Sequence, residues 1–363
     1  MASVIGDKIK VSVFGESHGP AIGMVMDSPP AGLTLDFDEI RRELSRRAPG
    51  NDPTATKRKE PDVPEFLSGI KGSVTTGAPL AAIIRNTSQR SGDYENICAK
   101  PRPSHADYAA GVHFGGFNDV SGGGHFSGRL TAPIVVAGAI LKQYLKTKGI
   151  YIGGHILSIG AAKDTRFDPV DITADRLCRL SSLSFSVIDP AAEEKMRSEV
   201  SAAAKDGDSI GGVLELAVTG IRAGFGGPMF DGAENIISKA VFGIPAVKGI
   251  EFGGGFALSE MRGSLANDSM EYNKDGKVFC KTNNNGGITG GITNGMPIIF
   301  RVAIKPTPSI AKAQNTVDTV TGNNTVLEIK GRHDPCIVPR ALPAVEAVTA
   351  IAVANLLSEE ALF

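Results

Sequence analysis

Histidines and arginines recur in glycine-rich surroundings along this 363-residue chain. The densest stretch, Arg102–Thr131, holds three of the six histidines and reads R-P-S-H-A-D-Y-A-A-G-V-H-F-G-G-F-N-D-V-S-G-G-G-H-F-S-G-R-L-T. Imidazoles titrate near neutral pH, whereas guanidiniums keep their charge, and glycine lets the main chain approach a ligand closely. This combination predicts a site that holds an anionic substrate and moves a proton. A glycine-rich surface loop with incidental histidines is the plainer alternative.

The same composition is found at five separated places in the chain. Arginine binds carboxylate and phosphate groups through a planar fork of donors, so several converging arginines suit a small molecule with more than one anionic group. A lone histidine is more often structural, but this repeated pairing with Arg and Gly is harder to attribute to packing. The residues that carry the pattern are His18 in G-E-S-H-G, Arg46 and Arg47 at a helix end, Arg102 and His105 in R-P-S-H-A-D, His125, Ser127 and Arg129 in G-G-G-H-F-S-G-R, and Arg332, His333, Asp334 and Arg340 in G-R-H-D-P-C-I-V-P-R.

Three other segments bear on the site. Asn283–Gly295 (N-N-N-G-G-I-T-G-G-I-T-N-G) and Lys305–Ser309 (K-P-T-P-S) offer main-chain amides, hydroxyls and one ammonium, a set that could hold a phosphate-bearing cofactor. Taken singly, each equally fits turns between strands. The loop Ala48–Pro64 is dense in charge and proline with few apolar residues to anchor it, which predicts mobility until something binds.

Several classes of protein are disfavoured. No stretch fits the P-loop, H-E-x-x-H or G-x-S-x-G, and Gly122–Gly124 only approaches a dinucleotide fingerprint, so a classical NAD or ATP enzyme is not expected. Zinc stays an alternative, although the spacings match no common ligand pattern. With 38 basic and 39 acidic residues, no overall field draws the chain to nucleic acid or membrane. Four scattered cysteines and an N-terminus without a signal-peptide core predict a reduced, cytoplasmic protein.

The elements that must position these residues follow from hydrophobic periodicity and caps. Strands come in neighbouring pairs, and the helices between them are apolar nearly all round, so they must be buried. The expected strands are Lys8–Phe14, Ile22–Met26, Phe66–Val74, Pro79–Arg85, Tyr151–Ile159, Val213–Val218, Lys277–Lys281, Pro297–Ile304 and Val326–Lys330. The expected helices are Asp36–Arg47, Ser104–Val112, Thr131–Lys146, one that Pro190 opens and Gly207 closes, Ala233–Phe242 and Ala341–Leu357.

This order lacks the sustained strand–helix alternation of a parallel sheet. The fold class is therefore predicted to be α+β, with helices sandwiched between antiparallel β-sheets. The strand, glycine turn and helix of Val213–Phe242 loosely repeat those of Ile22–Arg47. This similarity of pattern suggests an internal duplication.

Taken together, the motifs resemble those of the chorismate synthase family. G-E-S-H-G, R-P-x-H-A-D-Y, G-G-G followed by an R-S-S-A-R-E-T-like segment, G-G-I-x-G-G-I-x-x-G, K-P-T-x-S and G-R-H-D-P-C occur in the order in which that family carries them. They run from about residue 8 to residue 345, so the similarity covers essentially the whole chain and implies one domain over residues 1–363.

The resemblance implies a shikimate-pathway lyase that converts 5-enolpyruvylshikimate 3-phosphate to chorismate and phosphate by an anti-1,4-elimination. It implies reduced FMN as the cofactor, an association with NADP, and helices sandwiched between antiparallel sheets. It also implies a homotetramer. Because no additional flavin-reducing domain is present, an external flavin reductase would supply the reduced FMN. A flavin-binding or anion-binding scaffold without turnover, or an enzyme of another phosphorylated cyclic acid, remains as the alternative.

Residue roles carry over from the family by position. His18 would protonate or polarise the departing phosphate, His105 would supply a proton near the reduced flavin, and Asp334 would help relay the C6 proton away. Five arginines would neutralise substrate anions: Arg47, Arg102, Arg129, Arg332 and Arg340. The implied cofactor contacts are His125, Phe126, Ser127, Gly290, Lys305, Pro306, Thr307, Pro308, Ser309 and Arg332, and no metal site is implied.

The chain departs from the family pattern at three places. The usual R-S-S-A-R-E-T reads H-F-S-G-R-L-T, so His125 replaces an arginine and Leu130 an acid. We therefore expect flavin binding at that edge to be weaker or more dependent on pH. An arginine common after Arg47 is absent, with Pro53 near its position, and Pro245 stands where the family often has an asparagine.

Overall fold

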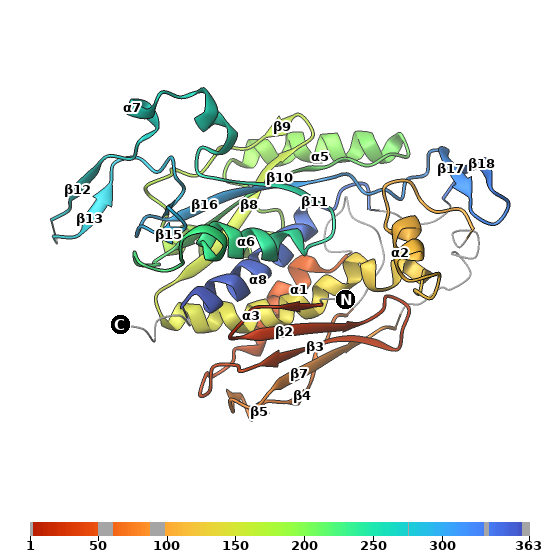
Figure 1. Ribbon diagram of the computed structural model, residues 1–363, viewed down its shortest axis with the longest axis horizontal. Coiled ribbons are helices and arrows are strands. Elements are labelled where there is room, and N and C mark those ends of the chain that lie inside the picture. The colour runs from red at the N-terminus through yellow and green to blue at the C-terminus, as the bar shows by residue number, and fades with distance from the viewer. Residues whose placement is uncertain (1–2, 50–60, 88–98, 275, 330–333, 358–363) are drawn as a thin grey trace.

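Two five-stranded antiparallel sheets enclose a layer of helices (Figure 1). The structure, a computed structural model, describes residues 3–49, 61–87, 99–274, 276–329 and 334–357. The predicted α+β class, with helices between antiparallel sheets, is confirmed. Most of the loop predicted to be mobile, and the predicted strand end at Lys330, lie outside the described residues.

The first sheet is built from the N-terminal part of the chain in the order β1-β2-β3-β7-β4. Ile22, Met24 and Met26 alternate along β3 and are fully buried against the helices, as a half-buried strand requires. The predicted antiparallel pairing of the first two long strands is confirmed, with Val13 opposite Met24. The strands are β1 (Val4–Ile5), β2 (Lys10–Gly15), β3 (Ala21–Asp27), β4 (Glu65–Ser68) and β7 (Leu80–Arg85).

One predicted strand of this sheet is wrong in its length. The segment expected to run over Phe66–Val74 ends after four residues in β4, which pairs with β7. The chain then forms a separate two-stranded hairpin of β5 (Ile70–Lys71) and β6 (Val74–Thr75). Gly69, whose φ is +85°, turns the chain between β4 and β5. A side chain at this position would collide with Leu80.

The second sheet has the order β11-β16-β10-β8-β9, and every neighbouring pair in it is antiparallel. Helix α5 (Pro190–Lys205) covers it on the side away from the first sheet (Figure 1), and α4 (Ala174–Ser182) packs against β8. The helix predicted from Pro190 begins as expected, with Asp189 as its N-cap. The strands are β8 (Tyr151–Ile159), β9 (Ala162–Lys163), β10 (Gly212–Thr219), β11 (Val247–Phe252) and β16 (Ile298–Ile304).

Helices α1 (Phe37–Arg47), α3 (Thr131–Thr147) and α8 (Val338–Leu357) form the middle layer, with α6 (Ala233–Phe242) packed on α8. Asp36 caps α1 by accepting hydrogen bonds from the amides of Asp38 and Glu39. Helices α3 and α8 touch at Gly138, where an added Cβ would lie 2.3 Å from Ala347. Among the described helices, α8 alone is long and apolar enough to cross a membrane, but 94% of its apolar window is buried inside the protein.

The remaining elements are short. Ser104, which was predicted to start a helix, does not cap α2; its φ is +61° and the helix begins at Asp107 without a side-chain cap. An arm that carries α7, β12 and β13 projects from one end of the second sheet, and β17 and β18 lie at the other end (Figure 1). These elements are α2 (Asp107–His113), α7 (Gly263–Ala266), β12 (Met270–Tyr272), β13 (Val278–Cys280), β14 (Ile288–Thr289), β15 (Ile292–Thr293), β17 (Gln314–Asp318) and β18 (Asn323–Leu327).

The two halves of the fold repeat one another. The segments Gly69–Pro79 and Gly287–Pro297 share Gly, Ile, Gly, Thr, Gly and Pro at matching positions, and each forms a two-stranded hairpin before a long strand. In the first half, the Thr75 hydroxyl donates to a carbonyl at 2.6 Å and accepts an amide at 2.9 Å. In the second, Thr293 makes the same two bonds at 2.8 and 3.0 Å. The duplication suggested by the sequence is therefore visible in matching side-chain contacts.

Candidate active site

A run of glycines separates two of the predicted catalytic histidines. Gly122, Gly123 and Gly124 all have positive φ and form an irregular turn ahead of α3. A Cβ on Gly122 would lie 2.2 Å from Nδ1 of His18, and one on Gly123 would lie 3.4 Å from Nε2 of His105. A side chain on Gly122 would overlap the His18 ring, and one on Gly123 would press closely on the His105 ring. The structure thus brings His18 and His105 to one turn although 87 positions separate them in the numbering.

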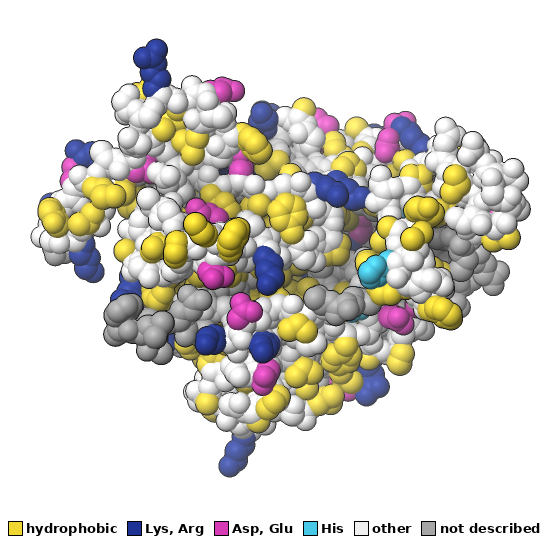
Figure 2. All heavy atoms as spheres, viewed as in Figure 1, with side chains coloured by type: hydrophobic (Ala, Val, Ile, Leu, Met, Phe, Trp, Pro, Cys, Tyr) yellow, Lys and Arg dark blue, Asp and Glu magenta, His cyan; other side chains and the backbone are white. Residues whose placement is uncertain are grey.

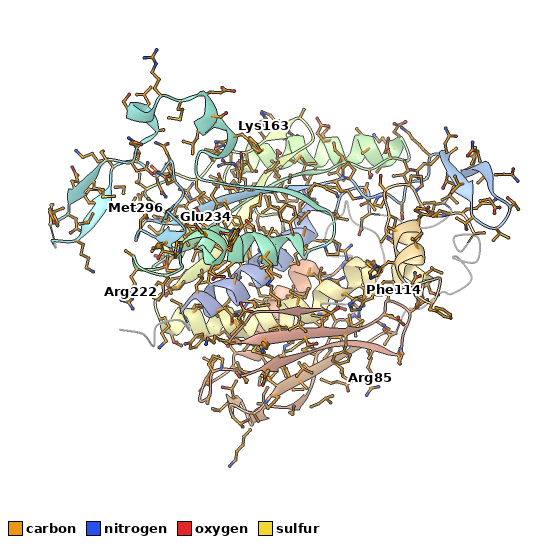
Figure 3. All side chains as sticks on the ribbon, in the orientation of Figure 1. Arg85, Phe114, Lys163, Arg222, Glu234 and Met296 are labelled. Carbon is orange, nitrogen blue, oxygen red and sulfur yellow. The ribbon has the colours of Figure 1, made fainter. Side chains whose placement is uncertain are left out.

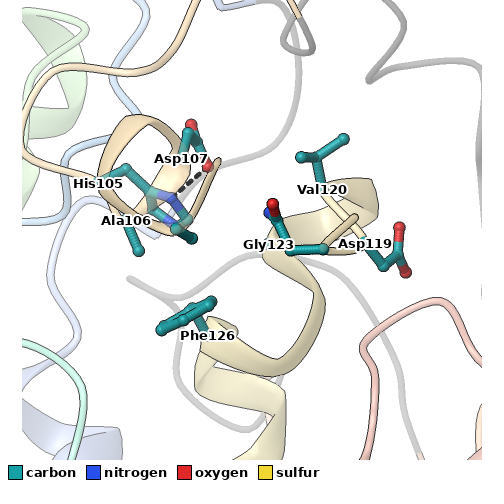
Figure 4. A pocket seen from close by; sticks show the side chains of 9 residues that line it. His105, Ala106, Asp107, Asp119, Val120, Gly123 and Phe126 are labelled. Carbon is teal, nitrogen blue, oxygen red and sulfur yellow. Dashed lines mark ion pairs between the residues drawn. The ribbon is translucent and has the colours of Figure 1, made fainter. Parts of the chain in front are cut away.

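His105 belongs to a largely buried group with Arg102 and Asp107. Figure 4 shows the ion pair between His105 and Asp107. Its Nδ1 lies 2.5 Å from Oδ1 of Asp107, and the Arg102 guanidinium donates to both oxygens of that carboxylate, at 2.7 and 2.8 Å. Burial alone would raise the pKa of Asp107, but the hydrogen bonds from Arg102 and His105 hold it well below its ordinary value. The carboxylate therefore stays charged and can fix the orientation of the imidazole.

The K-P-T-P-S segment packs directly against this group. Nη1 of Arg102 donates to Oγ of Ser309 at 3.3 Å, and Nζ of Lys305 donates to the carbonyl of Ser104 at 2.5 Å. Burial and the nearby charge of Lys248 lower the pKa of Lys305. Oγ1 of Thr307 is buried with no hydrogen-bond partner among the described residues. A polar atom in that state is suited to a bound ligand.

Arg47 and Arg129 form a second cationic group at the start of α3. Nη1 of Arg47 donates to Oδ2 of Asp62 at 2.8 Å, and Nη1 of Arg129 donates to the other oxygen of the same carboxylate. The side chain of Arg47 is 4% exposed, that of Arg129 5% and that of Asp62 2%. The structure therefore holds two buried guanidiniums side by side around one carboxylate.

Asp334 and Arg340 adjoin this second group. The Arg340 guanidinium pairs with the Asp334 carboxylate, and its Nε donates to the carbonyl of Arg47 at 2.9 Å. This contact places the start of α8 beside the end of α1. The predicted residues Arg332 and His333 lie outside the described residues.

Asn86 links the arginine pair to the loop that carries His18. Its Oδ1 accepts from Nε of Arg129 at 3.1 Å, while its Nδ2 donates to the carbonyls of Glu16 and Gly19 at 3.1 and 2.7 Å. The amide of Ser17 in turn donates to the carbonyl of Gly124 at 3.1 Å. One contiguous set of contacts therefore runs from the arginine pair through the His18 loop to the glycine turn and His105.

The H-F-S-G-R-L-T segment contributes in different ways. Both ring nitrogens of His125 have protein partners: Nδ1 lies 2.8 Å from the carbonyl of Gly15 and Nε2 lies 2.8 Å from Oγ of Ser3. A direct hydrogen bond from this ring to a flavin would require one of these contacts to break. Phe126 lines the pocket opposite His105 (Figure 4), and Ser127 caps the turn that leads into α3.

Two residues singled out by the sequence lie away from this cluster. Gly290 is at the tip of the β14–β15 hairpin, which packs on the start of α6. Figure 3 shows how far this hairpin is from the His105 region. Met296, which follows the hairpin, and Phe114, which follows α2, lie toward opposite ends of the long axis. Arg46 points from α1 to Glu346 of α8 within the helix layer, at 2.8 Å, and so serves the core.

A profile of the family described as chorismate synthase matches residues 9–357. The chain belongs to the chorismate synthase family. It is 46% identical over 350 residues to a chorismate synthase of Thermococcus kodakarensis, covering 96% of each chain. A chorismate synthase of Dehalococcoides mccartyi is 44% identical over 356 residues, or 98% of this chain and 96% of that one. A crystal structure of a chorismate synthase superposes with a TM-score of 0.76 at 28% identity, covering 98% of this chain and 93% of the other.

Sequence reasoning missed three polar residues of this chorismate synthase family site. Asp107 lies in the motif R-P-S-H-A-D, two residues after His105, and this short spacing is the signal that could have identified it as a partner of the imidazole. Asp62 lies in a loop expected only to be mobile, and Asn86 follows a strand without any motif of its own. Nothing local in the sequence distinguishes these last two residues from ordinary loop residues.

Proposed function

We propose that this protein converts 5-enolpyruvylshikimate 3-phosphate to chorismate and phosphate by an anti-1,4-elimination. The observation that supports this most directly is the convergence of four guanidiniums and two imidazoles from segments far apart in the chain. The substrate carries two carboxylates and a phosphate, and guanidiniums recognise such groups through paired donors. The cationic residues are Arg47, Arg102, Arg129 and Arg340.

The two histidines would handle the protons of the elimination. With Nδ1 of His105 donating to Asp107, the Nε2 edge of the ring faces Gly123 and is the edge available for proton exchange. His18, on the other side of the glycine turn, would protonate the departing phosphate as the C3–O bond breaks. Asp334 would help to carry away the proton lost from C6. General acid–base assistance of this kind is worth roughly 10²–10⁴-fold for each group.

The residues around Thr307 suit a flavin phosphate or ring edge. Its buried hydroxyl has no hydrogen-bond partner among the described residues, and Lys305 and Ser309 place an ammonium and a second hydroxyl nearby in sequence. When bound, reduced FMN supplies the electron chemistry of the reaction without net redox change. The residues proposed to hold it are Phe126, Ser127, Lys305, Pro306, Thr307, Pro308, Ser309 and Arg332, with His125 at the edge.

We propose further that the protein works in the cytoplasm as a homotetramer and receives reduced FMN from a separate reductase. Apolar side chains lie exposed over the projecting arm and the start of α6 (Figure 2). Tyr272 is 75% exposed and Phe256 84%, and a grouping of exposed apolar side chains of this kind suits contact with further copies. Gly290 would reach a flavin only if that flavin belonged to another copy.

An anaerobic assay with chemically reduced FMN tests the proposed activity. Release of phosphate together with the absorbance of chorismate is the expected result. Flavin binding without turnover would instead identify a scaffold, and turnover of a different phosphorylated cyclic acid alone would identify another enzyme. Replacing His18 or His105 by Ala should lower kcat by roughly 10²–10⁴-fold and leave the fold intact.

A further inference from the structure

The anion-binding arginines Arg47 and Arg129 already hold an anion that belongs to the chain itself. The Asp62 carboxylate lies between them with one oxygen on each guanidinium, in the bridging arrangement that a substrate carboxylate or phosphate would take. Its side chain is only 2% exposed. This occupancy has a physical reason, because two buried guanidiniums without a counter-ion would be strongly destabilising.

Two other nitrogens of Arg47 are bound by the protein itself. Its Nε donates to Oγ1 of Thr131 at 3.1 Å and its Nη2 to the carbonyl of Gly128 at 3.2 Å. Those two acceptors are fixed to each other at the start of α3 by a 2.6 Å hydrogen bond. The bond to Asp62 uses Nη1, and among these three partners Asp62 is the anion, so it is the contact that an anionic ligand would exchange.

Residues 61–64, which carry Asp62, have few attachments to other described residues. Pro61 and Val63 are exposed, the latter by 58%, and residues 61–64 make no main-chain hydrogen bond to another described residue. Asp62 itself has a φ of +42°, in the left-handed region that costs a non-glycine residue energy. The described attachments of this residue are thus mainly its two ion pairs, and these are the contacts that a ligand would replace.

We propose that Asp62 occupies the subsite of one anionic group of the substrate and is displaced when that group binds. This rests on the proposed function, which gives the arginine pair an anionic substrate. Asp62 then has two effects: it neutralises the pair in the free protein, and it lowers substrate affinity by competing for the same donors. A ligand must therefore compete with the Asp62 carboxylate for the two guanidiniums, which favours ligands of high negative charge.

Asp62→Asn tests the competition with inorganic phosphate as the probe at constant ionic strength. The amide keeps the size of the side chain but cannot compete as an anion, so we expect phosphate to half-saturate the variant at a concentration about tenfold lower, equivalent to about 1.4 kcal/mol. The Kd for phosphate, which is the half-saturating concentration, would be obtained by fitting the dependence of Tm on phosphate concentration. Glu65→Gln, which makes the same change at a surface pair with Arg85, should behave as wild type. Equal or weaker phosphate binding by Asp62→Asn would overturn the proposal.

A reporter on the native carboxylate covers the case in which Asp62→Asn does not fold. The chain has no tryptophan, so Val63→Trp introduces a single tryptophan, which can be excited selectively, at an exposed position beside Asp62. Saturating phosphate should change its emission, with half-saturation at the Kd obtained from the dependence of Tm on phosphate. Unchanged emission at saturation would overturn displacement. Neither measurement needs turnover, so failure of the lyase assay would contradict the proposed reaction without deciding the role of Asp62.

Discussion

The Nδ1 atom of His105 lies 2.5 Å from Oδ1 of Asp107, two residues further along the chain. Arg102 holds the same carboxylate through its main-chain amide and its guanidinium. A carboxylate fixed in this way selects the imidazole tautomer whose proton is on Nδ1. Asp107 therefore acts as a positioning residue for His105.

Asp107→Asn should lower kcat by about 10²-fold with little change in KM, because the amide can donate to Nδ1 and favour the opposite tautomer. The measurement is steady-state kinetics together with long-range ¹H–¹⁵N spectra of His105, which report the tautomer directly. Asp38→Asn, at an exposed pair with Arg41, serves as the control and should change neither. A variant with wild-type kcat and an unchanged spectrum would refute the positioning role.

Gly122→Ala should displace His18 from the glycine turn. The new methyl group would lie 2.1 Å from Cε1 of the ring, and the φ of +61° is unfavourable for alanine. We expect a loss of about 1–3 kcal/mol in the free energy of unfolding and at least a tenfold loss of kcat. Gly128→Ala is the matched control, since nothing lies within 4 Å of its added Cβ. Similar behaviour of the two variants in thermal unfolding and turnover would contradict this packing.

The sequence predicted those elements whose signals are local. Helix α1 begins after Asp36, and β8 and α6 have the predicted ends, because a cap or an unbroken apolar pattern marks them. Helix α4 was missed because only Leu177 and Leu180 of its nine residues are buried, too few for a clear period. Strand β11 was missed because it is an edge strand with a glycine inside it and one buried residue.

The site could be predicted in its residue types but only partly in its contacts. Arg102 and His105 share a motif, so their proximity follows from the sequence. The ion pairs of Asp62 with Arg47 and Arg129 depend on how the loop before β4 returns to α1 and α3, which no local pattern specifies. Arg46 shows the converse, because its charge looked functional but is paired inside the helix layer.

Glu346→Gln should destabilise the protein strongly. Glu346 is fully buried on α8 and accepts from Arg46 and from Nζ of Lys142, at 2.8 Å each. Burial would raise its pKa, but the charges of Arg46 and Lys142 outweigh burial and lower it to about 2. Without this charge, Glu43 is the carboxylate left beside the buried cations Arg46 and Lys142 among the described residues. We expect this to cost about 3–5 kcal/mol in the free energy of unfolding.

Urea unfolding of four variants checks this interpretation: Arg46→Met, Glu346→Leu, the two combined, and Lys312→Ala as a control. The double variant Arg46→Met/Glu346→Leu should lose much less than the sum of the two single variants, because it removes a cation together with an anion. Lys312→Ala, at an exposed pair with Asp206 and Asp208, should cost under about 1 kcal/mol. Additive losses in the double variant would show that the charges are not coupled.

The stability of the second sheet should fall as pH rises above neutrality, because of His155. This fully buried ring lies 2.9 Å from Asp164 and 3.0 Å from Glu215, one carboxylate at each nitrogen, so only the protonated form can donate to both. Burial would lower the pKa of His155, but the hydrogen bonds and charges of the two carboxylates raise it above its ordinary value. Arg301 lies 3.6 Å from the Glu215 carboxylate and shares it with His155.

The direction of the effect follows from linkage. Because the folded-state pKa is the higher one, the stabilisation is fully present below about pH 6.5, the unfolded value, and is lost as pH rises through the folded pKa. Between the two values this group alone lowers the free energy of unfolding by up to about 1.4 kcal/mol per pH unit. Urea unfolding from pH 6 to 9.5 should therefore show a steeper decline for wild type than for His155→Gln. His113→Gln, at an exposed ring, should follow wild type, and parallel curves for all three proteins would exclude a protonated His155.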